Sequence, residues 1–467
     1  MWKKDVSWWL AACLVFTVVA FYYGVTELWW MFDDSQHLKL VSHYGLKVFT
    51  HPAAEAGYIP ANFTPWLFLN YWIDYQLTGL NPKGAYIHHL VSMALVMIAV
   101  FILARKVMGP WFAAVLVICF FMSPVMSTLM HILCTRHYLE GLGYSCLSIF
   151  LFIQWREQHQ LWQLIVSALF YAIAALNKEV YVPLIGIFFS LIFLDFIKQY
   201  QWRVWKSLTP YMVVATGYIF YRGYALGWHR LISGYGSQGE HKGLQEIIYY
   251  LWEVVSYNKL LLAILVVAIF SVVRVYKHEQ PGKVDFFRFF VVAACCVICT
   301  LLPVYKVMHT ADINHNYIFV ATFVVWFGLV YLVFMLCPEK FENKYITLAV
   351  ITLVGFVFYQ AKYAIPGTYL MSYSQQSNLF ERYKTEGRFI LYRTENVQLL
   401  QPVGAPWHHS GLYDLRLQVL GQPTGPVACS NICQCDPGMP VYTWSDNQIF
   451  PAELAGISCT ENKVVSQ

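Results

Sequence analysis

The sequence predicts an all-α, multi-pass membrane protein, and three observations lead to that fold class. Hydrophobic residues make up 58% of the 467-residue chain and charged residues only 12%, whereas soluble domains carry about 25% charge. The mean hydropathy is +0.49. Aromatic residues gather at the ends of apolar runs, as at Trp8–Trp9 and Trp29–Trp30, where their rings favour the headgroup layer. The net charge of +5 therefore indicates topology rather than nucleic-acid binding.

About eleven apolar stretches approach the ~20 residues that a membrane-spanning helix needs. They are 7–27, 85–105, 110–127, 138–154, 160–177, 180–197, 207–222, 257–274, 288–304, 315–336 and 344–361. Alternate connecting loops are basic, with Lys3, Arg105, Arg156, Lys198, Arg274 and Lys340 among their residues. The positive-inside rule places these loops and the N-terminus in the cytoplasm. We expect the first span to be retained, because acids and aromatics follow it rather than a small-residue cleavage site.

Two outer segments are expected to fold beside the spans. Residues 1–362 form the transmembrane module, in which 28–84 is the first outer loop; the spacing of its apolar residues suits interfacial amphipathic helices, with a loop packed over helix ends as the alternative. Residues 363–467 form a small outer C-terminal domain. Four cysteines there predict two disulfides in any of three pairings, with a zinc site as the alternative. They are Cys429, Cys433, Cys435 and Cys459.

Charged and polar residues gather at the predicted outer ends of the spans, where ions are costly and hence functional candidates. They are Asp33, Asp34, Arg136, His137, Lys178, Glu179, Arg222, His315 and Asn316. Each has a structural alternative: Asp34 could cap a helix, Arg222 could anchor to headgroups, and Glu179 could simply neutralise Lys178. Together they could bind an anionic lipid headgroup beside a base. The two aspartates could also hold Mg²⁺ or Mn²⁺.

Four blocks of the sequence, in order, resemble the GT-C superfamily of integral-membrane glycosyltransferases that use polyprenyl-phosphate sugars. The blocks are 32–38 (FDDSQHL), 71–109, 123–152 (with CTRHYLEG) and 175–195 (ALNKEVYVPL onward). They are most similar to the transmembrane O-mannosyltransferase branch. Asn316 and Phe319 depart from the arginine and tyrosine of that family's pattern, and its tetratricopeptide tail is absent. The resemblance therefore implies a bacterial cell-envelope enzyme with an undecaprenyl-phosphate sugar donor.

The resemblance also implies roles for the site residues. Asp33 or Asp34 would be the general base of an inverting transfer, and Lys178, with Arg136, Arg222 or His315, would bind the donor phosphate, supported by Glu179, His137 and Asn316. No cofactor would be required. The acceptor would be an exported protein such as a pilin, or an envelope glycan, met on the periplasmic side of the inner membrane.

Other function classes stay open beside this one. A secondary transporter or lipid flippase would also bury ions, but we find no internal repeat, and the ions lie at span ends rather than near the midplane. An adhesion or assembly scaffold would explain the tail but not the convergent charges. No Walker loop, dinucleotide fingerprint or HExxH motif is present, which argues against soluble nucleotide sugars and proteolysis.

Overall fold

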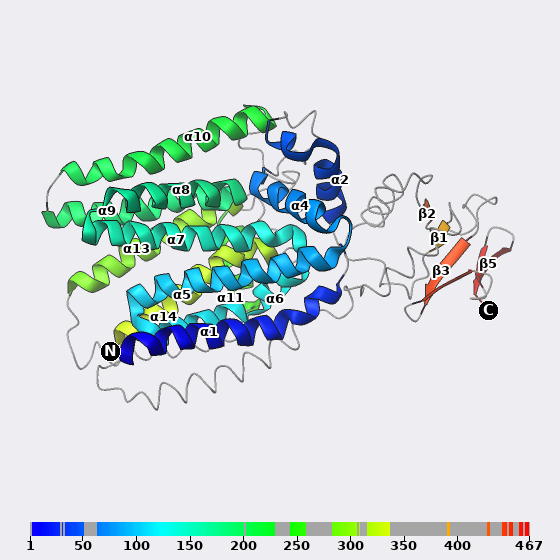
Figure 1. Cartoon of the computed structure of the whole chain (residues 1–467), viewed down its shortest axis with the longest axis horizontal. Helices are drawn as coiled ribbons and strands as arrows, with labels where there is room; N and C mark the ends of the chain where they lie inside the picture. The colour runs from blue at the N-terminus through cyan, green and yellow to red at the C-terminus, as the bar shows by residue number, and fades with distance from the viewer. Residues whose placement is uncertain are drawn as a thin grey trace.

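A computed structural model gives the fold of the chain (Figure 1). It describes residues 2–28, 30, 33–50, 63–199, 202–228, 243–257, 283–305, 308 and 315–336, and six strands in the C-terminal region. The helices are α1 (Trp2–Tyr22), α2 (Asp34–Tyr44), α4 (Pro65–Thr78), α5 (Pro82–Phe121), α6 (Pro124–His131), α7 (Arg136–Gln158), α8 (Leu161–Asn177), α9 (Ile185–Gln199), α10 (Thr209–Leu226), α11 (Leu244–Tyr257), α13 (Lys283–Val304) and α14 (Phe319–Leu336). Short 3₁₀ segments join several of them: η1 (Tyr23–Glu27), η2 (Gly45–Phe49), η3 (Leu133–Thr135), η4 (Glu179–Leu184), η5 (Trp202–Leu208) and η8 (His315–Ile318).

The chain is a helical, multi-pass membrane protein, as predicted. Four stretches of described helix are long and apolar enough to cross a bilayer: Trp8–Glu27, Pro82–Phe121, Glu179–Ile197 and Asn316–Met335. Leu161–Asn177 and Val291–Val304 are shorter apolar helices. The predicted spans 344–361 and, apart from Tyr257, 257–274 lie outside the described residues.

Helix α5 contains two spans rather than one. The side chain of Asn81 accepts a hydrogen bond from the Lys83 amide at 3.0 Å to cap its start, but Gly109 inside it has φ 79° and ψ 170°, a conformation that glycine adopts readily. A straight helix of 40 residues would be about 60 Å long. Yet the Tyr86 hydroxyl, near its start, donates to the carbonyl of His131, beyond its end, at 3.1 Å. The chain therefore reverses at Gly109, as the predicted spans 85–105 and 110–127 require.

The predicted end of the second of these spans was wrong. Span 110–127 stops at Phe121, and a new helix, α6, begins at Pro124. The Ser123 side chain accepts a hydrogen bond from the Met126 amide at 3.4 Å, and Pro124 occupies the first helical turn. Serine as N-cap followed by proline is a helix start, and it breaks a run that is apolar throughout.

The helices place two groups of charged residues at opposite ends of the module. At one end the Arg105 guanidinium lies over the Trp8 ring at 5.5 Å, and Lys106 pairs with Glu157 at 2.6 Å. At the other end Lys83 pairs with Glu27 at 3.2 Å. The predicted cytoplasmic side of the basic loops stays a prediction.

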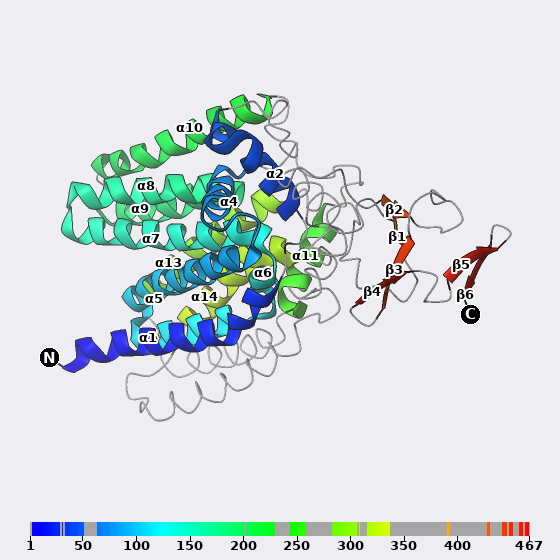
Figure 2. The same ribbon diagram turned by 45° about the vertical axis from the view of Figure 1, so that its right-hand side comes forward.

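The first outer loop contains the helices α2 and α4, which lie at the end of the bundle away from the N-terminus in both views (Figures 1 and 2). The described strands lie beyond that same end. Strands β1 (Ile390–Tyr392), β2 (Val427–Cys429), β3 (Val441–Ser445) and β4 (Gln448–Pro451) form one sheet in the order β2-β1-β3-β4, and β5 (Ile457–Thr460) pairs with β6 (Lys463–Ser466). Strand β1 is parallel to β2 and β3, and the other pairs are antiparallel.

The predicted disulfides of the C-terminal domain stay a prediction. The backbone of Cys429 belongs to β2 and that of Cys459 to β5. Cys433 and Cys435 lie outside the described residues.

Candidate active site

The two adjacent aspartates occupy different environments. Asp33 is the residue before α2, is partly exposed and makes no capping hydrogen bond with its side chain. Asp34 is fully buried, and its carboxylate accepts a hydrogen bond from the Tyr71 hydroxyl of α4. The structural alternative that Asp34 caps the helix is therefore wrong, because the N-cap position belongs to Asp33.

A stacked pair of rings fixes the turn that carries Asp33. His37 and Tyr71 stack with centroids 5.0 Å apart and planes 12° from parallel. The His37 Nδ1 lies 2.6 Å from the Asp33 carbonyl oxygen; because a carbonyl only accepts, Nδ1 carries the hydrogen. Burial lowers the pKa of His37, although the Asp33 carboxylate opposes this effect. A neutral His37 and Tyr71 thus hold the aspartate pair between α2 and α4.

Lys178 and its neighbours form a buried cluster with loose ionic contacts. Lys178 follows α8 in an extended conformation and is 5% exposed. Its Nζ lies 3.4 Å from a Glu179 carboxylate oxygen and 5.6 Å from the Tyr138 ring centroid. The other Glu179 oxygen is 3.8 Å from an Arg222 nitrogen. Burial lowers the pKa of Lys178; Glu179 opposes this shift, and Arg222 adds to it.

Tight packing docks this segment onto α7. The Tyr181 hydroxyl donates a hydrogen bond to the Tyr138 carbonyl. Its ring lies against Gly141, where an added Cβ would come within 2.1 Å of a Tyr181 ring carbon. A side chain at position 141 would therefore displace the Tyr181 ring.

Electrostatic interactions join these parts into one site. The charge of the Asp33 carboxylate raises the pKa of Lys178, against the larger effect of burial. Burial lowers the pKa of His137, and the charge of Lys178 adds to this effect. We call Asp33, Lys178, Glu179, Arg222 and His137 the open cluster; the sequence analysis predicted all of them, and the structure brings them together.

Segment η8 borders the open cluster. Asn316 interacts with the Tyr138 side chain, and the Tyr250 hydroxyl of α11 donates to the Tyr317 carbonyl at 2.8 Å. His315 begins η8, but its side chain is not among those described. Its predicted role at the phosphate therefore stays a prediction.

Arg136 belongs to a second group, which sequence reasoning did not predict. Its guanidinium donates to Asp74 at 2.8 Å and to the Ala85 carbonyl at 2.8 Å. Arg136 and Asp74 are 2% and 3% exposed, and His88 donates to the other Asp74 oxygen at 2.7 Å. Burial alone would raise the pKa of Asp74, but Arg136 and His88 outweigh it and hold that pKa below its usual value. These contacts favour a structural role for Arg136, and its predicted role at the donor phosphate stays a prediction.

Glu140 extends this second group along α7. Its oxygens accept hydrogen bonds from Asn70 at 2.5 Å and Ser92 at 2.7 Å. We call Asp74, His88, Arg136 and Glu140 the closed cluster. One signal could have found it: Glu140 follows Arg136 by four residues, so both lie on one face of a helix. Asp74 offered no such spacing, because its partners come from other helices.

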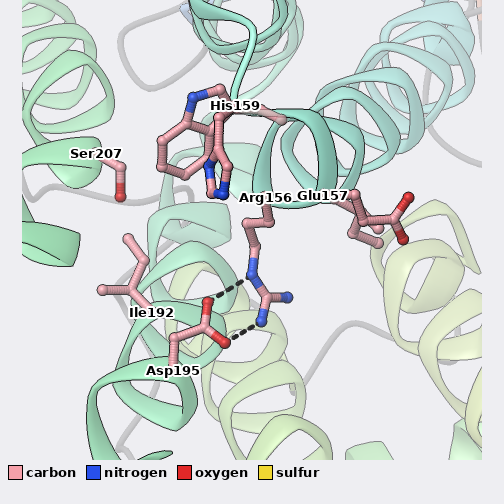
Figure 3. A pocket seen from close by; sticks show the side chains of 8 residues that line it. Arg156, Glu157, His159, Ile192, Asp195 and Ser207 are labelled. Atoms are coloured by element: carbon pink, nitrogen blue, oxygen red, sulfur yellow. Dashed lines mark hydrogen bonds and ion pairs between the residues drawn. The ribbon is translucent and has the colours of Figure 1, made fainter. Parts of the chain in front are cut away.

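A pocket of about 280 Å³ lies at the opposite end of the module (Figure 3). Trp155, Arg156, His159, Asp195 and Ser207 are among its lining residues. Asp195 of α9 accepts two hydrogen bonds from Arg156 of α7, from Nε at 2.6 Å and from a terminal nitrogen. This ion pair joins α7 to α9. None of the predicted site residues lines this pocket.

Comparison with known proteins yields a low similarity of fold. No protein-family model and no curated protein matches the sequence. Among solved structures, the chain is similar to ArnT from Cupriavidus metallidurans bound to undecaprenyl phosphate, with TM-score 0.40 and 11% identity over 93% of this chain and 86% of that one. The apo structure of the same protein gives TM-score 0.40 and 12% identity over 90% and 86%. Neither points to the O-mannosyltransferase branch.

Proposed function

We propose that the chain is a membrane glycosyltransferase that moves a sugar from a polyprenyl-phosphate donor to a hydroxyl acceptor. One observation carries the proposal: the buried ammonium of Lys178 lies between the Glu179 carboxylate, 3.4 Å away, and the Tyr138 ring, in the same half of the molecule as the partly exposed Asp33, whose charge raises the pKa of Lys178. A base and a cation held together at a helix end suit a reaction in which a proton is taken from one oxygen and negative charge develops on another.

The two charges divide the reaction between them. Asp33 accepts the proton of the acceptor hydroxyl while that oxygen forms a bond to the anomeric carbon of the sugar. The bond from the anomeric carbon to the phosphate oxygen breaks, and its electron pair stays on the phosphate. Attack opposite the leaving group inverts the configuration. Lys178 and Arg222 stabilise the departing phosphate, and burial makes this electrostatic contribution larger than it would be in water.

Asp34 serves a different purpose from Asp33. Its carboxylate is buried against Tyr71 and so anchors α2 on α4 instead of meeting an acceptor. This division assigns the base to Asp33. No metal or cofactor is needed in this scheme, because a single phosphate leaves and no pyrophosphate is broken.

Undecaprenyl phosphate is the donor carrier that we propose, on the periplasmic side of a bacterial inner membrane. The acceptor would be an exported protein or an envelope glycan. Three residues beside the base Asp33 carry one net positive charge between them: Lys178, Glu179 and Arg222. This charge matches the single negative charge of a sugar phosphodiester.

Conversion of the donor in detergent would distinguish an enzyme from a transporter or flippase. Detergent solution contains no membrane, so a protein that only moves lipids would leave the donor chemically unchanged. Purified protein is mixed with lipid-linked sugars as donors and with exported proteins and envelope glycans as acceptors, all extracted from the source cells, and release of undecaprenyl phosphate is followed by mass spectrometry. We expect release by the wild type, none by Asp33→Asn, and normal release by Glu157→Gln, which changes an exposed carboxylate at the opposite end. Binding without release by the wild type would favour a transporter.

A further inference from the structure

The pocket of Figure 3 lies far from the open cluster, where three segments of the chain meet. Its walls come from the end of α7, from α9 and from η5. Helix α7 begins with Arg136 and His137 and is 23 residues long, so it extends over about 35 Å. That length exceeds the ~30 Å hydrocarbon core of a bilayer. The pocket and the open cluster therefore lie at opposite membrane faces, and a role for the pocket is independent of the proposed transfer.

The side chains around the pocket are those of a membrane headgroup layer. Trp155 lines the pocket, and the nearby Trp162 is 55% exposed while its Nε1 donates to the Gln160 side chain at 2.7 Å. An exposed indole with a hydrogen-bonded N–H is typical of the membrane interface. From the same loop onward, α8 exposes an apolar stripe at four-residue spacing: Leu161, Ile165 and Leu169. Lipids that contact this stripe reach the pocket, so a lipid headgroup is the ligand class with direct access.

One positive and one negative side chain lie together in the pocket. The Arg156 guanidinium donates two hydrogen bonds to Asp195, and the two side chains are 27% and 23% exposed, so a ligand can reach both. A carboxylate has about four lone-pair positions, and Arg156 takes two of them. Glu157, the other acid of the lining, pairs with Lys106 at 2.6 Å, and Figure 3 shows its carboxylate directed away from Asp195. The pair Arg156–Asp195 thus offers one charge of each sign.

A headgroup that carries both charges matches this pair. Phosphatidylglycerol carries a phosphate alone, which Asp195 would repel. Phosphatidylcholine carries both charges, but its trimethylated nitrogen has no N–H to donate to a carboxylate. Phosphatidylethanolamine has a phosphate for Arg156 and a primary ammonium whose three N–H groups can donate to Asp195. The indole of Trp155 in the same lining adds an aromatic face that attracts an ammonium.

We propose that the pocket binds the headgroup of phosphatidylethanolamine, with the phosphate at Arg156 and the ammonium at Asp195 and Trp155. Because the Arg156–Asp195 pair joins α7 to α9, the bound lipid would stabilise the contact between these helices at this membrane face. The inference does not rest on the proposed function, so either can fail without the other.

The test measures which lipid the pocket prefers. The full chain is purified and delipidated in detergent, and native mass spectrometry gives its dissociation constants for phosphatidylethanolamine, phosphatidylcholine and phosphatidylglycerol. We expect the wild type to bind phosphatidylethanolamine about 10-fold or more tightly than the other two, the factor that a hydrogen bond to a charged group supplies. Asp195→Asn should abolish this preference. Glu157→Gln is the matched control: it removes the other acid of the lining and should bind like wild type.

A second variant keeps the test decisive if Asp195→Asn does not fold. Trp155→Leu leaves the Arg156–Asp195 pair in place and removes the aromatic face, so the affinity for phosphatidylethanolamine should fall about 5-fold and that for phosphatidylglycerol should not change. Equal binding of the three lipids by the wild type, or an equal loss in Asp195→Asn and Glu157→Gln, would overturn the proposal. Tightest binding of phosphatidylglycerol would also overturn it, because the pocket would then be a site for anionic lipids.

Discussion

The open and the closed cluster contain similar residues but differ in how tightly those residues are paired. In the closed cluster the Arg136–Asp74 contact is 2.8 Å, both partners are almost fully buried, and His88 occupies the second carboxylate oxygen. In the open cluster the ionic contacts are 3.4 and 3.8 Å, and Glu179 is 27% exposed. Short contacts between buried residues suit a structural role, whereas the longer contacts of the open cluster suit the substrate-binding role that we propose. We therefore propose the open cluster as the one that performs chemistry.

The largest effect on turnover should come from the base of the open cluster. Asp33→Asn keeps the size of the side chain and removes its ability to accept a proton, so turnover should fall about 10²- to 10⁴-fold. Protein level and melting temperature should stay close to wild type. Asp34→Asn, the neighbouring control, should instead lower stability, because Asp34 is buried against Tyr71. Near-normal turnover in Asp33→Asn would place the base elsewhere.

The closed cluster should show the largest effect on stability. Asp74→Asn leaves the Arg136 guanidinium buried without a counter-charge, and losing one partner of a buried pair costs about 3–5 kcal/mol. Chemical unfolding in detergent would measure the loss. Turnover per folded molecule should change little. If Asp74→Asn is as stable as wild type, another negative group must neutralise Arg136, and the prediction is wrong.

The pairing of Lys178 with Glu179 can be tested by removing both charges. If Lys178 binds the donor phosphate, loss of its charge-assisted hydrogen bond costs roughly 1.5–3 kcal/mol. The donor KM should then rise about 10- to 150-fold. If Lys178 binds the leaving phosphate more tightly in the transition state than in the ground state, kcat should fall as well. Lys178→Met/Glu179→Gln should then stay as impaired as Lys178→Met. Recovery of both activity and stability in the double variant would make the pair merely structural.

The smallest expected effect is a dependence of stability on pH. The pKa of Asp74 is held below its usual value of 3.8 by Arg136 and His88, against the opposite effect of burial. A carboxyl group with a depressed folded-state pKa stabilises the protein above the unfolded value, and this contribution is lost as the pH falls through the folded value. The melting temperature of wild type should therefore drop below about pH 4 more than that of Asp74→Asn. Parallel curves would contradict the assignment.

The helices could be predicted from sequence because lipid leaves the backbone few choices. Every N–H and C=O in the bilayer must be hydrogen-bonded within the protein, so an apolar run of sufficient length becomes a helix. The reversal at Gly109–Pro110 was visible for the same reason, as two apolar runs separated by basic residues. The break at Ser123–Pro124 was missed because apolar residues flank it on both sides.

The site was only partly predictable. Lys178 and Glu179 were found because ions at the ends of spans are rare and costly. Asp33 and Asp34 could not be separated, because they differ only in whether Tyr71, from another helix, reaches the carboxylate. Arg136 was assigned to the phosphate because its partner Asp74 lies 62 residues away, and no local pattern joins them.

The same substitution in each cluster tests most directly whether the open one is catalytic and the closed one structural. Lys178→Met and Arg136→Met both delete a buried cation, and melting temperature and donor turnover would be measured for each on the same preparation. We expect Lys178→Met to lose turnover and keep its melting temperature, and Arg136→Met to lose melting temperature while its folded fraction turns over normally. The reverse pattern, with Arg136→Met stable and inactive, would contradict the division.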